Sequence, residues 1–173
     1  MRDKLATKRK IVAGMIKLMD SMKYQDITVK EICSETGVSR MTYYRNFHDK
    51  KDLLIYHFDG LFTTFIQRVS SSHSRTFYDI ATIFFNLIRE DQHVMELLIQ
   101  NDLTVIIRER LRYYIGGLID QRVLSFRENS SKLLVSMISG GLTEILVTWT
   151  NDGMQEPVES LVIFASKYMH FKK

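Results

Sequence analysis

Residues 39–53, SRMTYYRNFHDKKDL, gather arginines, tyrosines, hydroxyl side chains and lysines on a short segment with little apolar content. Arginine can donate two hydrogen bonds to guanine, and threonine and methionine can contact the methyl group of thymine in the major groove of DNA. Tyrosine and lysine have the donors that phosphate oxygens accept. The segment therefore has the side chains needed to contact double-stranded DNA, provided that an element presents them on its outer faces.

A helical wheel shows which of these side chains must face inward. With about 100° per residue, Tyr43 and Phe47 share one side of a helix, and Val38 lies just before it. Tyr44 cannot face inward together with Tyr43, so we predict that Tyr43 is buried and Tyr44 is exposed. The remaining faces present Arg40, Met41, Thr42, Tyr44 and Arg45.

Three helix starts around this segment each carry a capping residue. Thr28 and Glu31 have the spacing of a capping box, in which each side chain accepts a hydrogen bond from the backbone of the other residue. Gly37 suits the left-handed end of that helix. Ser39 caps a second helix, and Asp49, with another aspartate three positions later, caps a third. These signals predict short helices joined by a tight turn.

The segments 28–36 and 40–47, joined by that turn, have the lengths of a helix-turn-helix. A tight corner between helices is common, but this one lies in the basic part of the chain. Residues 1–52 contain 12 Lys and Arg against 7 Asp and Glu, whereas residues 53–173 contain 12 against 13. The asymmetry indicates a polyanion as the partner of the N-terminal third, although a solvated basic face gives the same count.

The rest of the sequence is helical by pattern. One proline, eight glycines and the lack of a useful alternating segment predict an all-α fold. We expect a three-helix, helix-turn-helix DNA-binding domain at residues 1–52 and a helical regulatory and dimerisation domain at residues 53–173. A long helix follows Leu53, and further helices are predicted at residues 76–90, 92–100, 103–124, 131–150 and 157–171.

Other classes of function lack their signatures. There is no glycine-rich phosphate loop, no HExxH and no GxSxG, so we predict no enzyme, no catalytic residues and no cofactor. We also predict no metal, although a zinc site built from His57, His73 or His93 with an acidic residue stays an alternative. A single cysteine, no secretory signal and an interrupted apolar run at 133–149 favour a cytoplasmic protein without a membrane span.

Residues 27–54, ITVKEICSETGVSRMTYYRNFHDKKDLL, resemble the DNA-binding signature of the TetR/AcrR family of transcriptional regulators. The likeness extends over about residues 5–58 and includes the Thr-Val-x-x-Ile opening, the Gly-Val-Ser turn, the Thr-Tyr-Tyr-x-x-Phe helix and the Lys-x-x-Leu after it. Two residues depart from the usual pattern, since members often have glycine at the position of Met41 and alanine at that of Cys33.

The resemblance implies a homodimeric repressor that binds a palindromic operator, with one recognition helix in the major groove of each half-site. Thr28 and Lys30 would meet the backbone or a base edge. Arg40, Met41 and Thr42 would read bases. The phosphate contacts would come from Tyr44, Arg45, Asn46 and Lys50. The full set expected at DNA is Thr28, Lys30, Ser39, Arg40, Met41, Thr42, Tyr44, Arg45, Asn46, Lys50 and Lys51.

For the C-terminal helices the resemblance implies an effector site and a dimer interface. The aromatic residues expected to line a ligand pocket are Phe62, Phe65, Tyr78, Phe85, Tyr113 and Trp149. The residues expected at the dimer interface are Ser136, Gly140, Gly141, Leu161, Ala165 and Met169. Burial inside one protomer would produce the same patterns. The effector is a small molecule or a protein co-regulator, and a helical interaction module without DNA binding is the alternative from another class.

Overall fold

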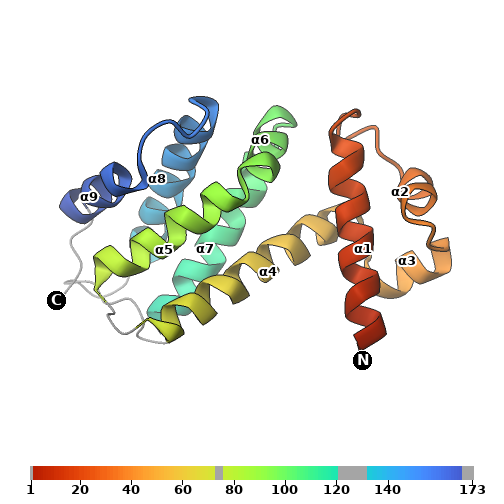
Figure 1. Cartoon of the computed structure of the whole chain (residues 1–173), viewed down its shortest axis with the longest axis horizontal. Helices are drawn as coiled ribbons and strands as arrows, with labels where there is room; N and C mark the ends of the chain where they lie inside the picture. Colours follow the sequence, from red (N-terminus) through yellow and green to blue (C-terminus); the bar gives the residue numbers. More distant parts are fainter. Residues whose placement is uncertain (1, 73–75, 121–131, 169–173) are drawn as a thin grey trace. The chain divides into compact units, whose positions relative to one another are not determined.

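The computed structural model describes residues 2–72, 76–120 and 132–168, and this part of the chain contains α-helices and no strand (Figure 1). The predicted all-α fold is confirmed. The helices are α1 (Arg2–Met19), α2 (Val29–Thr36), α3 (Arg40–Asn46), α4 (Lys50–Ser71), α5 (Phe77–Glu90), α6 (Gln92–Gln100), α7 (Thr104–Asp120), α8 (Lys132–Asn151) and α9 (Val158–Tyr168). The predicted ends of two helices, at 121–124 and 169–171, lie outside the described residues.

The chain forms two compact units, an N-terminal unit at Met1–Gly60 and a C-terminal unit at Leu61–Lys173. The sequence placed the domain boundary after residue 52, whereas the units divide within α4. Leu53 and Leu54 have no exposed surface and Phe58 is buried, so the first turns of α4 contribute apolar side chains to the N-terminal unit. The roles expected for the two domains remain predictions.

In the N-terminal unit α1 packs against α2, and α2 packs against α3. Ile11, Met15 and Ile32 are fully buried between these helices. Gly14 lets α1 and α2 approach closely, because a Cβ atom at this position would lie 2.1 Å from Cγ2 of Thr36. Apolar spacing on α1 and α2 and this one small residue thus build the support on which α3 rests.

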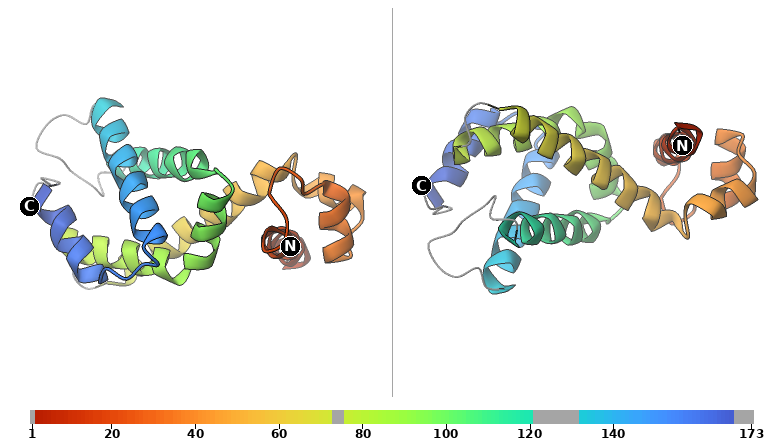
Figure 2. Two further views of the ribbon diagram at one scale, coloured as in Figure 1. Left: turned by 90° about the horizontal axis from the view of Figure 1, so that it is seen from above. Right: turned by 90° about the horizontal axis from the view of Figure 1, so that it is seen from below.

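In the C-terminal unit α7 packs against α8, and α9 lies beside α5, as both views of Figure 2 show. α6 also contacts α8. One core cluster joins α4, α5 and α7 through Phe65, Val69, Leu87 and Leu118. Its borders are formed by half-buried aliphatic and aromatic side chains, namely Leu61, Phe62, Ile66, Ile80, Ile83 and Phe84.

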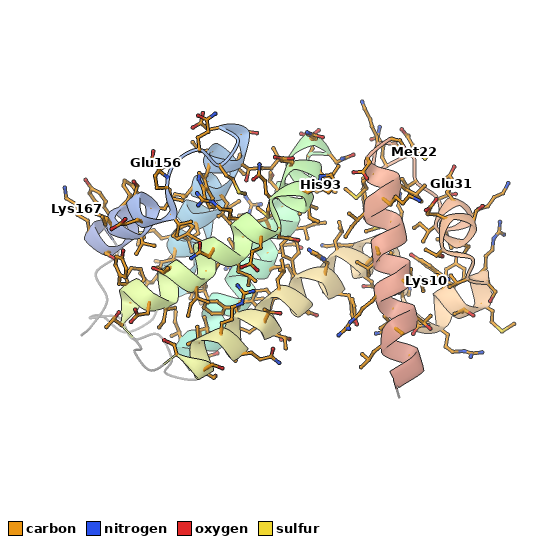
Figure 3. The ribbon with its side chains drawn as sticks, viewed as in Figure 1. Lys10, Met22, Glu31, His93, Glu156 and Lys167 are labelled. Atoms are coloured by element: carbon orange, nitrogen blue, oxygen red, sulfur yellow. The ribbon has the colours of Figure 1, made fainter. Side chains whose placement is uncertain are left out.

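The turn between α8 and α9 is held by two side chains that converge on one carbonyl. The indole N–H of Trp149 and the guanidinium of Arg89 both donate to the backbone oxygen of Glu156, each over 2.9 Å. Arg89 also lies over the Trp149 ring, 5.1 Å from its centroid. Glu156 is labelled in Figure 3. These contacts fix where α9 begins.

By length and composition α8 could cross a membrane, a test that core helices of water-soluble proteins also pass. A third of its most apolar stretch is buried inside the protomer. Leu133 and Met137, at 80% and 67% exposure, belong to the uncovered part. Such large apolar side chains in one row favour burial against another surface.

Candidate nucleic-acid interface

The predicted capping box at the start of α2 is confirmed. The hydroxyl of Thr28 accepts from the backbone N–H of Glu31 at 3.3 Å, and the Glu31 carboxylate accepts from the Thr28 N–H at 2.6 Å. This backbone hydrogen bond holds the pKa of Glu31 below its ordinary value. Figure 3 labels Glu31 at this helix end. Gly37 ends α2 with φ of 65°, the left-handed conformation predicted for it.

α3 presents one face to the core and another to solvent, as the wheel predicted. Tyr43 is fully buried and Phe47 is buried after it, whereas Tyr44 is 60% exposed. The hydroxyl of Ser39 accepts from the backbone N–H of Thr42 at 3.1 Å, which confirms Ser39 as the cap. The cap and the two inward aromatic rings therefore set which side chains α3 exposes.

The exposed face of α3 carries side chains suited to reading DNA. Arg40 and Arg45 are exposed, and Met41 is 72% exposed. The guanidinium of Arg45 donates to the Met41 sulfur over 3.8 Å, so the two side chains lie together along the helix. Arginine, thioether and phenol groups on one short helix can contact guanine, thymine methyl groups and phosphates.

Asn46 and Thr42 are less available than the sequence suggested. Both side chains are half-buried. The amide nitrogen of Asn46 donates to the backbone oxygen of Thr42 at 2.8 Å, and the Thr42 hydroxyl lies 2.9 Å from that of Ser39. The Asn46 amide nitrogen and the Thr42 hydroxyl therefore already serve α3 itself, whereas the amide oxygen of Asn46 is buried without a hydrogen-bond partner among the described residues.

Lys50 was predicted to bind a phosphate, and the structure gives it a different role. Its ammonium donates to the backbone oxygens of Tyr24 at 2.6 Å, Gln25 at 3.2 Å and Ile27 at 2.6 Å. An ammonium has three N–H groups, so these three carbonyls use all of them. Burial lowers the pKa of this side chain. These contacts compete with the phosphate contact predicted for Lys50.

The start of α4 is acidic as well as capped. The Asp49 carboxylate accepts from the Asp52 N–H at 3.0 Å, and the Asp52 carboxylate accepts from the His48 N–H at 2.7 Å. The predicted cap is confirmed. The other residues expected at DNA, namely Thr28, Lys30, Ser39 and Lys51, are exposed.

The six aromatic residues predicted to line a pocket differ in exposure, although ring contacts through Phe84 and Tyr114 connect Phe62, Phe65, Phe85, Tyr113 and Trp149. Phe65, Phe85 and Trp149 are buried, and the rings of Phe85 and Trp149 meet edge to face at 6.0 Å. Tyr78 and Tyr113 are 43% and 67% exposed, so they lie on the surface of the protomer. The regular spacing of aromatic residues did not show which of them face the core.

Phe62 belongs to a cluster that the spacing of the aromatic residues did not indicate. Its ring stacks on that of Tyr114 with centroids 4.0 Å apart and planes 6° apart. The guanidinium of Arg110 lies over the rings of Tyr113 and Tyr114 and donates to the Tyr114 hydroxyl at 3.1 Å. The spacing of three and four residues from Arg110 is the signal that could have indicated these contacts.

Ala165, predicted at the dimer interface on α9, is buried in the single protomer. This residue is 2% exposed because its side of α9 packs inside the protomer, together with Val162. Ser136, Gly140 and Leu161 are half-buried, Gly141 is exposed, and Met169 lies outside the described residues. The large apolar side chains that α9 exposes are Ile163, Phe164 and Tyr168. α9 has two apolar faces, and the sequence alone did not distinguish the covered one.

The described residues include no group of three or more His, Cys, Asp or Glu side chains arranged to hold a metal ion. His73, one of the three histidines considered for zinc, lies outside the described residues.

Comparison with known proteins adds the family. A model described as the C-terminal region of a transcriptional regulator family, of TetR type, matches residues 75–171. The chain belongs to the TetR family of transcriptional regulators. The match lies outside the helix-turn-helix, so the C-terminal helices and the N-terminal signature indicate the family independently. Together they identify this TetR-family protein as a DNA-binding transcriptional regulator.

Solved structures share the fold of this chain. A TetR transcriptional regulator from Streptococcus agalactiae 2603V is 19% identical, with a TM-score of 0.67 over 98% of this chain and 96% of its own. The fatty acid degradation regulator FadR from Bacillus halodurans is 19% identical, with a TM-score of 0.65 over 94% of each chain. The dihydroxyacetone kinase operon activator DhaS is 18% identical, with a TM-score of 0.60 over 95% of this chain and 94% of its own. No curated protein sequence matches the chain.

Proposed function

We propose that this TetR-family regulator is a cytoplasmic repressor that binds a palindromic operator as a homodimer and is released by an effector. The observation that carries the proposal is the division of α3, with Tyr43 fully buried beneath an exposed row of Arg40, Met41 and Tyr44. A short helix that shows arginine and apolar groups outward, on a rigid apolar support, suits the major groove.

Within that interface the side chains divide by reach and chemistry. Arg40 and Met41 project from the first turn of α3 and are assigned to base edges. Tyr44 and Arg45 follow on the exposed face and are assigned to phosphates, as is Lys30 on α2. Base contacts set sequence preference, whereas phosphate contacts set affinity and register. This division can be tested one residue at a time.

The homodimer is supported by apolar surface that one protomer leaves uncovered. α8 exposes Leu133 and Met137, with Gly141 on the same face, and α9 exposes Ile163 and Phe164. We assign these two faces to the dimer interface, in place of the face that contains Ala165. A dimer also gives the seven-residue α3 a second copy, so that two half-sites related by a two-fold axis can bind together.

The effector is proposed to act on the C-terminal unit, as a small molecule or a protein co-regulator. The direction of regulation has a second candidate. DhaS, which shares the fold, is described as the activator of an operon. A reporter gene placed behind the selected operator separates the two, since a repressor lowers expression and an activator raises it.

The first test of DNA binding selects duplexes from a random library with the full-length protein. We expect a palindromic sequence. Arg40→Ala should then weaken binding by roughly 1–3 kcal/mol and relax the preference at one position of each half-site. The matched variant Tyr44→Phe should weaken all duplexes alike. Binding without sequence enrichment and without salt dependence would favour the interaction module instead.

A further inference from the structure

The ammonium group of Lys50 forms its hydrogen bonds with the protein's own backbone. Lys50 is the first residue of α4. Its ammonium donates to three backbone oxygens in the loop between α1 and α2, those of Tyr24, Gln25 and Ile27. The ammonium also lies over the Tyr24 ring, 4.6 Å from its centroid. Hydrogen bonds from a charged donor are stronger than those between neutral groups.

The loop that Lys50 holds leads directly into the helix-turn-helix. Ile27 is 1% exposed, and the next residue, Thr28, is the N-cap of α2. α3 follows α2 after the left-handed turn at Gly37. Since these connections are short, the position of this loop relative to α4 fixes the position of α2, and α2 in turn supports α3.

A phosphate contact would require Lys50 to give up these partners. The ammonium would have to leave its hydrogen bonds to three carbonyl oxygens, and such a loss is costly for partly buried groups. The side chain of Lys30 on α2 is exposed, so it can contact a phosphate without such a loss. The two lysines therefore offer a matched pair, one turned into the protein and one turned to solvent.

We infer that Lys50 sets operator affinity as a positioning residue, which ties the first turn of α4 to the entry of the helix-turn-helix, and that it donates to no DNA phosphate. The inference rests on the proposed DNA-binding function. It also connects the start of α4 to the recognition helix indirectly, through the loop between α1 and α2 and through α2 itself.

The first experiment measures operator binding against salt for the full-length wild type, Lys50→Met and Lys30→Ala. Each lost phosphate contact lowers the slope of log K on log salt by about 0.9, hence by about 1.8 in a dimer. We expect that loss for Lys30→Ala. For Lys50→Met we expect weaker binding, an unchanged slope and a smaller ratio between operator and random duplex. A slope reduced as in Lys30→Ala, or unchanged affinity, overturns the inference.

A second experiment uses only the wild type, so it holds even where Lys50→Met does not fold. Brief acetylation with acetic anhydride, followed by mass spectrometry, reports how accessible each amine is, and fragment ions separate Lys50 from Lys51. We expect Lys50 to react slowly both without and with the selected duplex, and Lys30 to react quickly unless DNA is present. Fast reaction of Lys50 in the free protein, with protection by DNA, overturns the inference. Failure of the wild type to bind any duplex would instead refute the proposed function.

Discussion

The two units of this chain differ in the internal contacts that define their helices. In the N-terminal unit, polar groups at fixed sequence offsets decide where each helix begins, through the caps at Thr28, Ser39 and Asp49. In the C-terminal unit, large aromatic side chains such as Phe85 and Trp149 meet across helices that are distant in sequence. Local polar contacts can be predicted from offsets along the sequence. Contacts between helices depend on which helices pack together, and the sequence pattern does not show this directly.

The largest effect should come from the core of the C-terminal unit. Trp149→Ala removes a ring that is 3% exposed, its hydrogen bond to Glu156 and the surface under Arg89. We expect a loss of about 3–5 kcal/mol in the free energy of unfolding, because a large cavity remains. Urea unfolding followed by circular dichroism measures it.

The matched control is Tyr113→Ala, which removes an aromatic ring that is 67% exposed in the same unit. We expect a change within about 0.5 kcal/mol, as for most surface positions. Equal losses for the two variants would show that burial does not rank the aromatic residues of this unit.

The next effect compares glycines in the two units. Gly14→Ala places a methyl group against Thr36 and should destabilise the N-terminal unit by about 1–3 kcal/mol through overpacking. At Gly117 in α7 an added Cβ would meet no atom of the described residues within 4 Å beyond its chain neighbours and the backbone of its own helix, so Gly117→Ala should stabilise the protein by about 1 kcal/mol. Adding Thr36→Ser to Gly14→Ala removes the clashing methyl and should restore much of the loss. Thermal melts of the two single glycine variants and of the double variant measure these changes in stability.

The sequence predicted those features of the interface that depend on neighbours along the chain. Tyr43 and Tyr44 had to face opposite ways because they are consecutive in a helix, and Ser39 and Glu31 lie at the fixed offsets that caps require. The helical fold followed from the apolar periodicity and the scarcity of proline.

The features that the sequence did not predict depend on distant partners. Lys50 bonds to residues more than twenty positions earlier, which no local pattern indicates. α9 has two apolar faces, and Ala165 lies on the face that packs inward. Only the packing of the neighbouring helix determines which of the two faces is buried. The capping box of Thr76 and Asp79 at the start of α5 is an exception, since its two residues are only three positions apart.

That second capping box gives a matched pair of moderate effect. Thr28→Ala and Thr76→Ala each remove a hydroxyl that accepts the N–H of the third residue of a helix, so each should cost about 1 kcal/mol of stability. Only Thr28→Ala should also weaken operator binding, because α2 supports α3 and Thr28 is itself among the residues expected at DNA. Loss of DNA binding in both variants would mean that general stability, and not the local position of α2, controls the interface.

The smallest effect is a dependence on pH that differs between the units. Hydrogen bonds from the Thr28 backbone lower the pKa of Glu31, and the paired guanidinium of Arg68 lowers that of Glu90, both from an ordinary value of 4.5. A pKa that is lower in the folded state stabilises the protein above the unfolded value, and the contribution is lost as the pH falls through the folded value. Both carboxylates should therefore lose their contributions below about pH 4.5.

Salt separates these two contributions. Arg68 and Glu90 form an exposed ion pair with two N···O distances of 2.7 Å, and salt screens such pairs. The bond from the Thr28 N–H to Glu31 is a local hydrogen bond that salt affects less. Glu31→Gln keeps an acceptor for the capping box but removes the titration. Between pH 7 and 3 this variant should lose less stability than the wild type in both low and high salt, whereas Glu90→Gln should differ from the wild type only in low salt. Equal salt sensitivity of the two variants would show that Glu31, too, acts mainly through its charge.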